Sequence, residues 1–204
     1  MNDPRFIELR DFWDNQAATF DDDPDHGLRD PLVRKAWTDK LATWLPSPPG
    51  QVLDIGCGTG SLSIVLAEMG FTVLGVDWSP AMIAQAQVKA KASGNEIRFQ
   101  VMDAADPPLP QQQFDVLVCR HLLWALPEPE QVLHRWVKLL KPQGKLILIE
   151  GYWHTGGGIH ANDLVAKLPA GLSDAIVEDL SPLKDLWGRE ISDERYVIQA
   201  YRQG

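Results

Sequence analysis

The 204-residue sequence is short of cysteine, of long apolar runs and of positive charge. Cys57 and Cys119 are too few for a disulfide scaffold or a cysteine-rich zinc site. No run approaches membrane-spanning length, and the start, MNDPRFIELRDF, lacks the apolar core of a signal peptide. These absences predict a soluble, cytoplasmic protein with no membrane partner.

Acidic residues outnumber basic ones, 28 Asp and Glu against 19 Lys and Arg, for a net charge of −9. A surface that follows nucleic-acid phosphates needs clustered Lys and Arg, so no nucleic-acid partner is expected, although a local basic patch is compatible with the acidic total. The length and the 45% apolar composition are enough for one domain with a substantial core. A small molecule or a protein is the better candidate partner.

The first fifty residues predict helices. Apolar residues recur there at helical spacing: Phe6, Leu9, Trp13 and Ala17. The stretch DDDPDHG (21–27) interrupts this pattern, and Asp30 with Pro31 predicts the start of a second helix that ends before PSPPG. We expect residues 1–49 to form a helical cap or lid on a single domain.

From residue 50 the pattern alternates between apolar strands and helices. The expected strands are QVLDIG, FTVLGVD, EIRFQVMD, FDVLVCR and KLILIEG, and Ser79 with Pro80 predicts the start of one intervening helix. Apolar strands alternating with helices predict a parallel sheet covered on both faces. In the tail, DAIVEDL and RYVIQAYR are too close for a helical crossover and predict an antiparallel pair at a sheet edge. The expected fold is an α/β, Rossmann-like three-layer sandwich with a seven-stranded, mostly parallel sheet.

A glycine loop follows the first predicted strand, in VLDIGCGTG (52–60). Gly56, Gly58 and Gly60 allow a tight turn and let a ligand approach bare backbone, and the next helix offers free N–H groups to an anion. The dinucleotide fingerprint needs its third glycine one place later, where Ser61 stands. Taken alone, these glycines also fit a turn that only joins a strand to a helix.

Two acids stand at the ends of the next two predicted strands. Asp77 is placed to accept the hydroxyls of a ribose, and Asp103 to accept an amino group such as that of adenine. Each also fits a role as a helix or turn cap. Their occurrence together with the glycine loop favours a nucleoside ligand.

The motifs VLDIGCGTG, LGVD, VMDAAD, FDVLVCR and LKPQGKLILIE, in this order and spacing, resemble those of class I S-adenosylmethionine-dependent methyltransferases, most closely the small-molecule branch. The resemblance covers roughly residues 50 to 150 and makes S-adenosylmethionine the expected cofactor, with S-adenosylhomocysteine as its product. It implies a donor-binding core at 50–150 and an acceptor side with closing strands at 151–204. The donor-contact residues that it implies are Asp54, Gly56, Cys57, Gly58, Gly60, Asp77, Trp78, Met82, Asp103, Ala104, Cys119 and Arg120.

The acceptor side is less determined, because displacement at a sulfonium carbon needs alignment and exclusion of water more than a dedicated catalytic group. His121, directly after the fourth strand, is the candidate base for a hydroxyl or acidic-carbon acceptor; its alternative is a structural turn histidine. Candidate substrate contacts are Trp13, Phe20, His26, Trp124, Trp153 and His154. The 21–27 segment that holds His26 fits equally a solvated acidic loop. Arg189 and Arg195 are expected in surface ion pairs.

No metal is expected, because His154, His160 and Asp163 lack convincing ligand spacing. The expected function is methyl transfer to a small molecule. The alternatives are a non-catalytic S-adenosylmethionine-binding regulator, a protein methyltransferase and, on weaker grounds, an NAD-dependent oxidoreductase.

Overall fold

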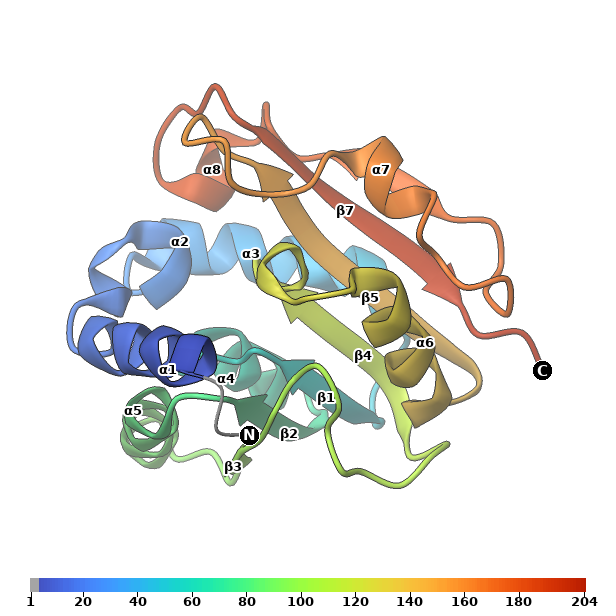
Figure 1. The fold of residues 1–204 in the computed structure, drawn as a ribbon. Helices are drawn as coiled ribbons and strands as arrows, with labels where there is room; N and C mark the ends of the chain where they lie inside the picture. Colours follow the sequence, from blue (N-terminus) through green and yellow to red (C-terminus); the bar gives the residue numbers. More distant parts are fainter. Residues whose placement is uncertain (1–3) are drawn as a thin grey trace.

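The computed structural model describes residues 4–204 and their side chains from residue 8 onward, so the side chain of Phe6 lies outside the described part. Within these residues seven strands form one sheet, in the order β3-β2-β1-β4-β5-β7-β6 (Figure 1). The strands are β1 (Gln51–Ile55), β2 (Thr72–Asp77), β3 (Arg98–Val101), β4 (Phe114–Arg120), β5 (Leu140–Tyr152), β6 (Ile176–Asp179) and β7 (Glu194–Tyr201). All pairs are parallel except those of β7, which runs antiparallel to both β5 and β6. The predicted sheet and its antiparallel closing pair are confirmed.

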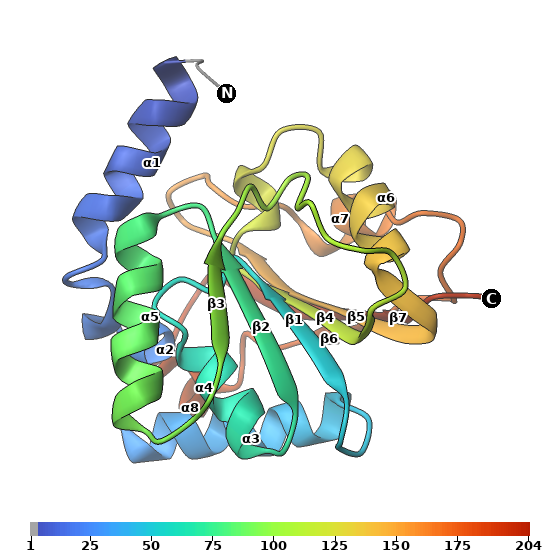
Figure 2. The ribbon, with the colours of Figure 1, turned by 90° about the horizontal axis from the view of Figure 1, so that it is seen from below.

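Helices cover both faces of the sheet and make three layers. The helical elements are α1 (Pro4–Gln16), η1 (Phe20–Asp22), α2 (Pro24–Gly27), α3 (Pro31–Trp44), α4 (Ser61–Glu68), α5 (Pro80–Ala92), η2 (Leu123–Ala125), α6 (Pro129–Leu139), α7 (Ala161–Val165) and α8 (Lys184–Trp187). Figure 2 shows α3, α4, α5 and α8 on one face and α6 and α7 on the other. None of the described helices is long and apolar enough to cross a membrane.

Alternating strand residues build a separate core on each face, as a strand period of two requires. In β1, Val52 packs into the core that contains Trp37 and Trp44, whereas Leu53 packs into the core that contains Trp136. All three indole rings are almost fully buried. Much of the tryptophan content therefore fills the interior of the molecule.

The two predicted helix starts are confirmed by their caps. The Asp30 carboxylate accepts the Leu32 N–H at 2.8 Å with Pro31 at the first helical position, and Ser79 Oγ accepts the Met82 N–H at 3.0 Å with Pro80 following it. Each cap satisfies an N–H group that the first helical turn leaves unpaired. Residues 21–27 differ from the expected interruption, because they contain the end of η1 and the whole of α2.

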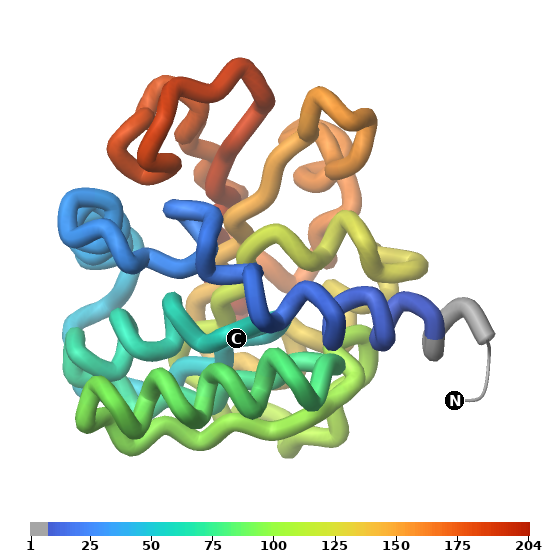
Figure 3. The backbone as a smooth tube through the Cα atoms, turned by 90° about the vertical axis from the view of Figure 1, so that its left-hand side faces the viewer, coloured from blue at the N-terminus to red at the C-terminus, as the bar shows by residue number. Residues whose placement is uncertain are grey.

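The strand order reverses direction at β1, which pairs with β2 on one side and β4 on the other. Loops leaving the carboxyl ends of β1 and β4 lead to opposite faces of the sheet, and a crevice opens between them. Helix α1 lies alongside α5 near this end (Figure 3). The fold thus places the glycine loop, the strand ends and the N-terminal helices around one crevice.

Candidate functional site

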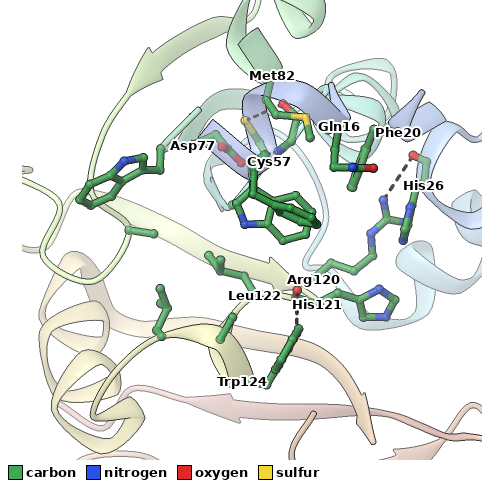
Figure 4. A pocket seen from close by; sticks show the side chains of 18 of the residues that line it. Gln16, Phe20, His26, Cys57, Asp77, Met82, Arg120, His121, Leu122 and Trp124 are labelled. Carbon is green, nitrogen blue, oxygen red and sulfur yellow. Dashed lines mark hydrogen bonds between the residues drawn. The ribbon is translucent and has the colours of Figure 1, made fainter. Parts of the chain in front are cut away.

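A cavity of about 570 Å³ opens at the carboxyl ends of β1, β2 and β4. Its walls come from the glycine loop, from α1 and the 20–27 segment, and from the loop after β4 (Figure 4). Trp153, His154, Arg189, Asp193 and Arg195 also line it. Segments far apart in the sequence therefore share one site. The volume is within the range of small-molecule sites.

The glycine loop forms the floor of the cavity. Gly56 and Gly58 have φ of 72° and 52°, a left-handed conformation that L-residues other than glycine rarely adopt. A Cβ on Gly56 would lie 2.5 Å from Leu122 Cδ2, and a Cβ on Gly58 would lie 3.2 Å from the Phe20 ring. Both positions require glycine, and they leave bare backbone facing the cavity.

Two of the implied donor contacts, Gly60 and Cys119, do not line the cavity. Gly60 caps α4 and faces inward, where a Cβ would lie 2.9 Å from both Ala86 Cβ and Phe99 Cζ. Cys119 is the second-last residue of β4, between Ile55 and Leu148 of the neighbouring strands, and is fully buried. Both are packing residues in the described structure.

Asp77 ends β2 and joins two loops of the site. One carboxylate oxygen accepts the Gly58 N–H and the other accepts the Ser79 N–H, each at 2.9 Å. Burial raises the pKa of Asp77, while these backbone hydrogen bonds act in the opposite direction. Each oxygen keeps further acceptor capacity, which suits a pair of adjacent hydroxyls.

The remaining residues implied for the nucleoside end lie along the same side of the cavity: Trp78, Met82, Asp103 and Ala104. The Asp103 carboxylate accepts the Ala105 N–H at 2.8 Å, so its suggested role as a turn cap is realised. It also lines the cavity, and the two roles coexist.

Asp54 lies beneath the glycine loop and is almost fully buried. Its carboxylate accepts the Ser63 hydroxyl at 2.5 Å. Burial raises its pKa to about 6, against the hydrogen bond from Ser63 and the charge of Arg120. The neighbouring Cys57 thiol has a pKa raised by burial and by Asp54, so it is held as an unreactive thiol.

The N-terminal segment closes one side of the cavity. Phe20 stacks on His26 at 4.4 Å between ring centroids and meets the edge of Trp13 at 6.3 Å. Asp21 and Asp25 are only 7% and 8% exposed. The interpretation of this segment as a solvated acidic loop is therefore wrong for these two acids, because their carboxylates are packed inside the molecule.

On the acceptor side, aromatic rings contact one another at varied angles. His121 lies 6.0 Å from Trp187 and 5.4 Å from Trp153, which in turn lies 5.2 Å from Trp124. Burial, and then the charge of Arg120, hold the pKa of His121 well below its usual value. The imidazole is therefore neutral at physiological pH and can accept a hydrogen bond.

Arg195 corrects the expectation of a surface ion pair. It is only 6% exposed, its guanidinium lies 5.0 Å from the Trp153 ring, and it pairs with Asp193 at 3.1 Å. Arg189 stays exposed but also lines the cavity. The sequence did hold a sign that Arg195 is buried, because it lies within a predicted strand. A charged residue buried there needs a partner.

Arg120 and His154 lie at different depths of the cavity. The Arg120 guanidinium donates to the Asp25 carbonyl and lies 5.1 Å from the Trp37 ring, so its side chain anchors the 20–27 segment. His154 lies at the mouth of the cavity and pairs with Asp193 at 3.2 Å. The resemblance implied Arg120 as a donor contact and did not indicate this side-chain role.

Comparison with known proteins finds similarity to methyltransferases. Residues 53–148 match the family described as a methyltransferase domain. The ubiquinone biosynthesis O-methyltransferase of Coxiella burnetii (strain Dugway 5J108-111) is 39% identical over 95 residues, which cover 47% of this chain and 41% of that protein. The crystal structure of magnesium protoporphyrin IX methyltransferase from Synechocystis PCC 6803 with bound SAM is 28% identical, with a TM-score of 0.63 and coverage of 85% of this chain and 77% of that one.

The crystal structure of the [4+2]-cyclase SpnF gives a TM-score of 0.71 at 22% identity and covers 82% of this chain and 80% of that one. At that identity the likeness concerns the fold alone. This fold therefore carries more than one chemistry. The match to the Coxiella burnetii protein spans less than half of that protein's length.

Proposed function

We propose that this chain, whose residues 53–148 belong to the class I S-adenosylmethionine-dependent methyltransferase family, transfers a methyl group from that donor to a small-molecule acceptor. The observation that carries the proposal is the meeting of Asp77, Asp103 and the bare backbone of Gly56–Gly58 around one cavity at the point where strand order reverses. Such a cavity suits an adenosine ligand with an amino-acid tail.

The residues present fit the donor by their chemistry. We assign the ribose hydroxyls to Asp77, the adenine edge to Asp103 and the Ala104 N–H, and the ring faces to Trp78 and Met82. Gly56 and Gly58 would receive the amino-acid end of the donor. Asp54 would help to orient that end indirectly, through the glycine loop above it. The donor supplies an already activated methyl group, so these residues need only hold and orient it.

We assign the N-terminal segment to exclusion of water and the ring-lined wall to the acceptor. Phe20 and Trp13 cover the glycine loop, while Trp124 and Trp153 present apolar faces on the opposite side. His121 and His26 lie between these two walls, 6.2 Å apart by ring centroid. An acceptor with a flat apolar body suits this space.

Substitution of Asp77 with Ala tests the donor site. Loss of a charge-assisted acceptor should weaken S-adenosylhomocysteine binding by about 10–100-fold, measured by isothermal titration calorimetry. Asp39 is the matched control, because it is exposed on α3, away from the cavity, and pairs with Lys35. Equal affinities for wild type, Asp77→Ala and Asp39→Ala would contradict the assigned donor site.

Incubation with labelled donor and a metabolite extract tests the acceptor class. The expected result is label in a low-mass product. Label in a purified protein instead would indicate a protein methyltransferase, and donor binding without turnover on any acceptor would indicate a regulator. Preference for NAD over S-adenosylhomocysteine in a competition assay would favour the oxidoreductase alternative.

A further inference from the structure

Three potential metal ligands from two distant parts of the chain meet inside the cavity. Asp25 and His26 lie on α2, and His121 follows β4. Each offers one ligand atom, and these atoms all lie within 4.8 Å of one another. From this meeting we propose that Asp25, His26 and His121 bind a divalent transition-metal ion, which contacts an oxygen atom of the methyl acceptor.

The kind of ligand selects the kind of metal. Two imidazoles and one carboxylate suit Zn²⁺ and its neighbours Co²⁺ and Fe²⁺, whereas Mg²⁺ and Ca²⁺ prefer all-oxygen sites. Zinc bonds of about 2.1 Å set tetrahedral ligands roughly 3.4 Å apart. The His26 Nε2 to Asp25 Oδ2 distance of 3.8 Å is close to this, and a bound ion would draw the wider separations, up to 4.8 Å, inward.

Both imidazoles are available as ligands. Each ring places a nitrogen atom in the space that the three side chains share. His121 Nε2 is buried and has no hydrogen-bond partner among the described residues. A buried ring nitrogen without a partner is costly, and a metal ion or a ligand in the cavity would relieve that cost.

The backbone around each ligand is held in place. His121 has φ of 56°, its N–H donates to the Ile149 carbonyl at 2.9 Å, and its ring stacks on Trp187. A non-glycine residue in this conformation stores strain that is common at functional sites. On the other side, Arg120 anchors the Asp25 carbonyl, so both halves of the trio are positioned in advance.

The local charges limit the cost of a second cation beside Arg120. Asp23 lies 3.8 Å from His26 Nδ1, and Asp54 also faces Arg120 in the interior. Asp25 and Asp54 act on the guanidinium, and Asp23 and Asp25 lie beside the His26 imidazole. Their charges offset the repulsion between the two cations.

The chemical role of the ion rests on the proposed function. Three protein ligands leave a coordination position open, as catalytic metal sites do. A hydroxyl oxygen of the acceptor in that position would lose its proton to solvent more easily. Its electron pair then forms the new O–CH₃ bond while the methyl–sulfur bond breaks and S-adenosylhomocysteine leaves. The methyl acceptor is therefore an oxygen nucleophile.

Titration of EDTA-treated, dialysed protein with Co²⁺ tests the site through the visible absorption bands of the bound ion. We expect wild type to bind one equivalent that Zn²⁺ displaces. His26→Asn and His121→Asn should each weaken binding by more than about 100-fold, beyond the effect of losing an outer-shell partner. His154→Asn is the matched control, a histidine at the same cavity that lies outside the trio and should bind as wild type does.

Circular dichroism melts identify any variant that fails to fold, and Asp25→Asn then provides a third substitution of the trio. Absence of Co²⁺ binding by wild type, or equal loss in His154→Asn, would overturn the site. S-adenosylhomocysteine binding is measured on the same wild-type sample. If wild type binds Co²⁺ but not S-adenosylhomocysteine, the proposed function is wrong and the metal site stands. If it binds S-adenosylhomocysteine but not Co²⁺, only the metal site is wrong.

Discussion

Gly60 and Gly94 have nearly the same left-handed backbone, with φ of 77° and 74°, but different surroundings. A Cβ on Gly60 would overlap Ala86 and Phe99, whereas nothing lies within 4 Å of a Cβ on Gly94. Gly60→Ala should therefore lower the free energy of unfolding by about 2–4 kcal/mol, from strain and overpacking together. Gly94→Ala should cost about 1 kcal/mol, from strain alone. Urea denaturation followed by circular dichroism measures both.

Equal destabilisation by the two substitutions would contradict this account, because it would leave the close contacts of Gly60 without effect. The three glycines of one sequence motif also have two different roles in the structure. Gly56 and Gly58 face the cavity, while Gly60 faces the helix packed behind the loop. All three belong to one motif, and only the structure distinguishes them.

At the same scale, the residues predicted best were those fixed by their own strand. Asp77 and Asp103 follow strand ends, and parallel strands end on one side of a sheet, so their meeting at one cavity was predictable. Arg195 was not, because its aromatic partners come from other elements. The trio of Asp25, His26 and His121 likewise depends on a contact between segments about a hundred residues apart, which spacing along the chain does not encode.

At the scale of elements, the N-terminal segment is tied to the donor side by a buried polar network. Lys89 on α5 donates to Asp21 Oδ2 at 2.6 Å, to Ser61 Oγ at 2.7 Å and to Thr59 Oγ1 at 3.1 Å. Burial lowers the pKa of Lys89, although the hydrogen bond and the charge of Asp21 act to raise it. One side chain therefore joins η1, the glycine loop and α4.

Lys89→Met should loosen this segment without removing the apolar stem of the side chain. Loss of a charge-assisted hydrogen bond should raise amide hydrogen exchange in residues 20–27 and speed S-adenosylhomocysteine dissociation by about tenfold. Lys91→Met is the control, because Lys91 is exposed on the same helix. Hydrogen exchange with mass spectrometry measures the first effect and stopped-flow fluorescence the second. Indistinguishable exchange in the two variants would rule out Lys89 as the connection.

Element boundaries were predictable where caps and periodicity coincide. Ser79 with Pro80 and Asp30 with Pro31 mark helix starts that the structure keeps, and FDVLVCR matches β4 from end to end. Residues 20–27 were missed as helix because four-residue turns carry no periodicity and contain Asp, Pro and Gly, which also favour loops. Lys89 and Arg120, both distant in the sequence, hold these turns in place through Asp21 and the Asp25 carbonyl.

At the scale of the whole molecule, the sheet that divides the two cores also holds buried acids. Glu150 in β5 is fully buried, and one of its oxygens accepts the Leu122 N–H at 3.1 Å and the Leu123 N–H at 2.7 Å. The other oxygen has no partner among the described residues. Glu150 thus fixes the loop after β4, and through it one wall of the cavity, to the neighbouring strand.

Burial raises the pKa of Glu150 to about 8 from an ordinary 4.5, against its backbone hydrogen bonds. Between these two values the unfolded chain is ionised while the folded chain keeps the proton, so the folded state binds more protons. The free energy of unfolding therefore falls as the pH rises through this window. Above pH 8 the stabilisation that came from this bound proton is lost. Asp54, with a pKa of about 6, acts in the same direction in the lower part of the window.

Glu150→Gln should flatten this dependence, because an amide oxygen can accept both loop N–H groups and does not ionise. Relative to its own value at pH 5, the variant should lose less stability by pH 8 than wild type, by up to about 4 kcal/mol from the linkage of one group. Urea denaturation at half-unit pH steps measures the slopes, with the exposed Glu190→Gln as control. Parallel curves for wild type and Glu150→Gln would mean that Glu150 is already ionised in the folded protein at pH 5. Its charge would then have to be met by the two loop N–H groups.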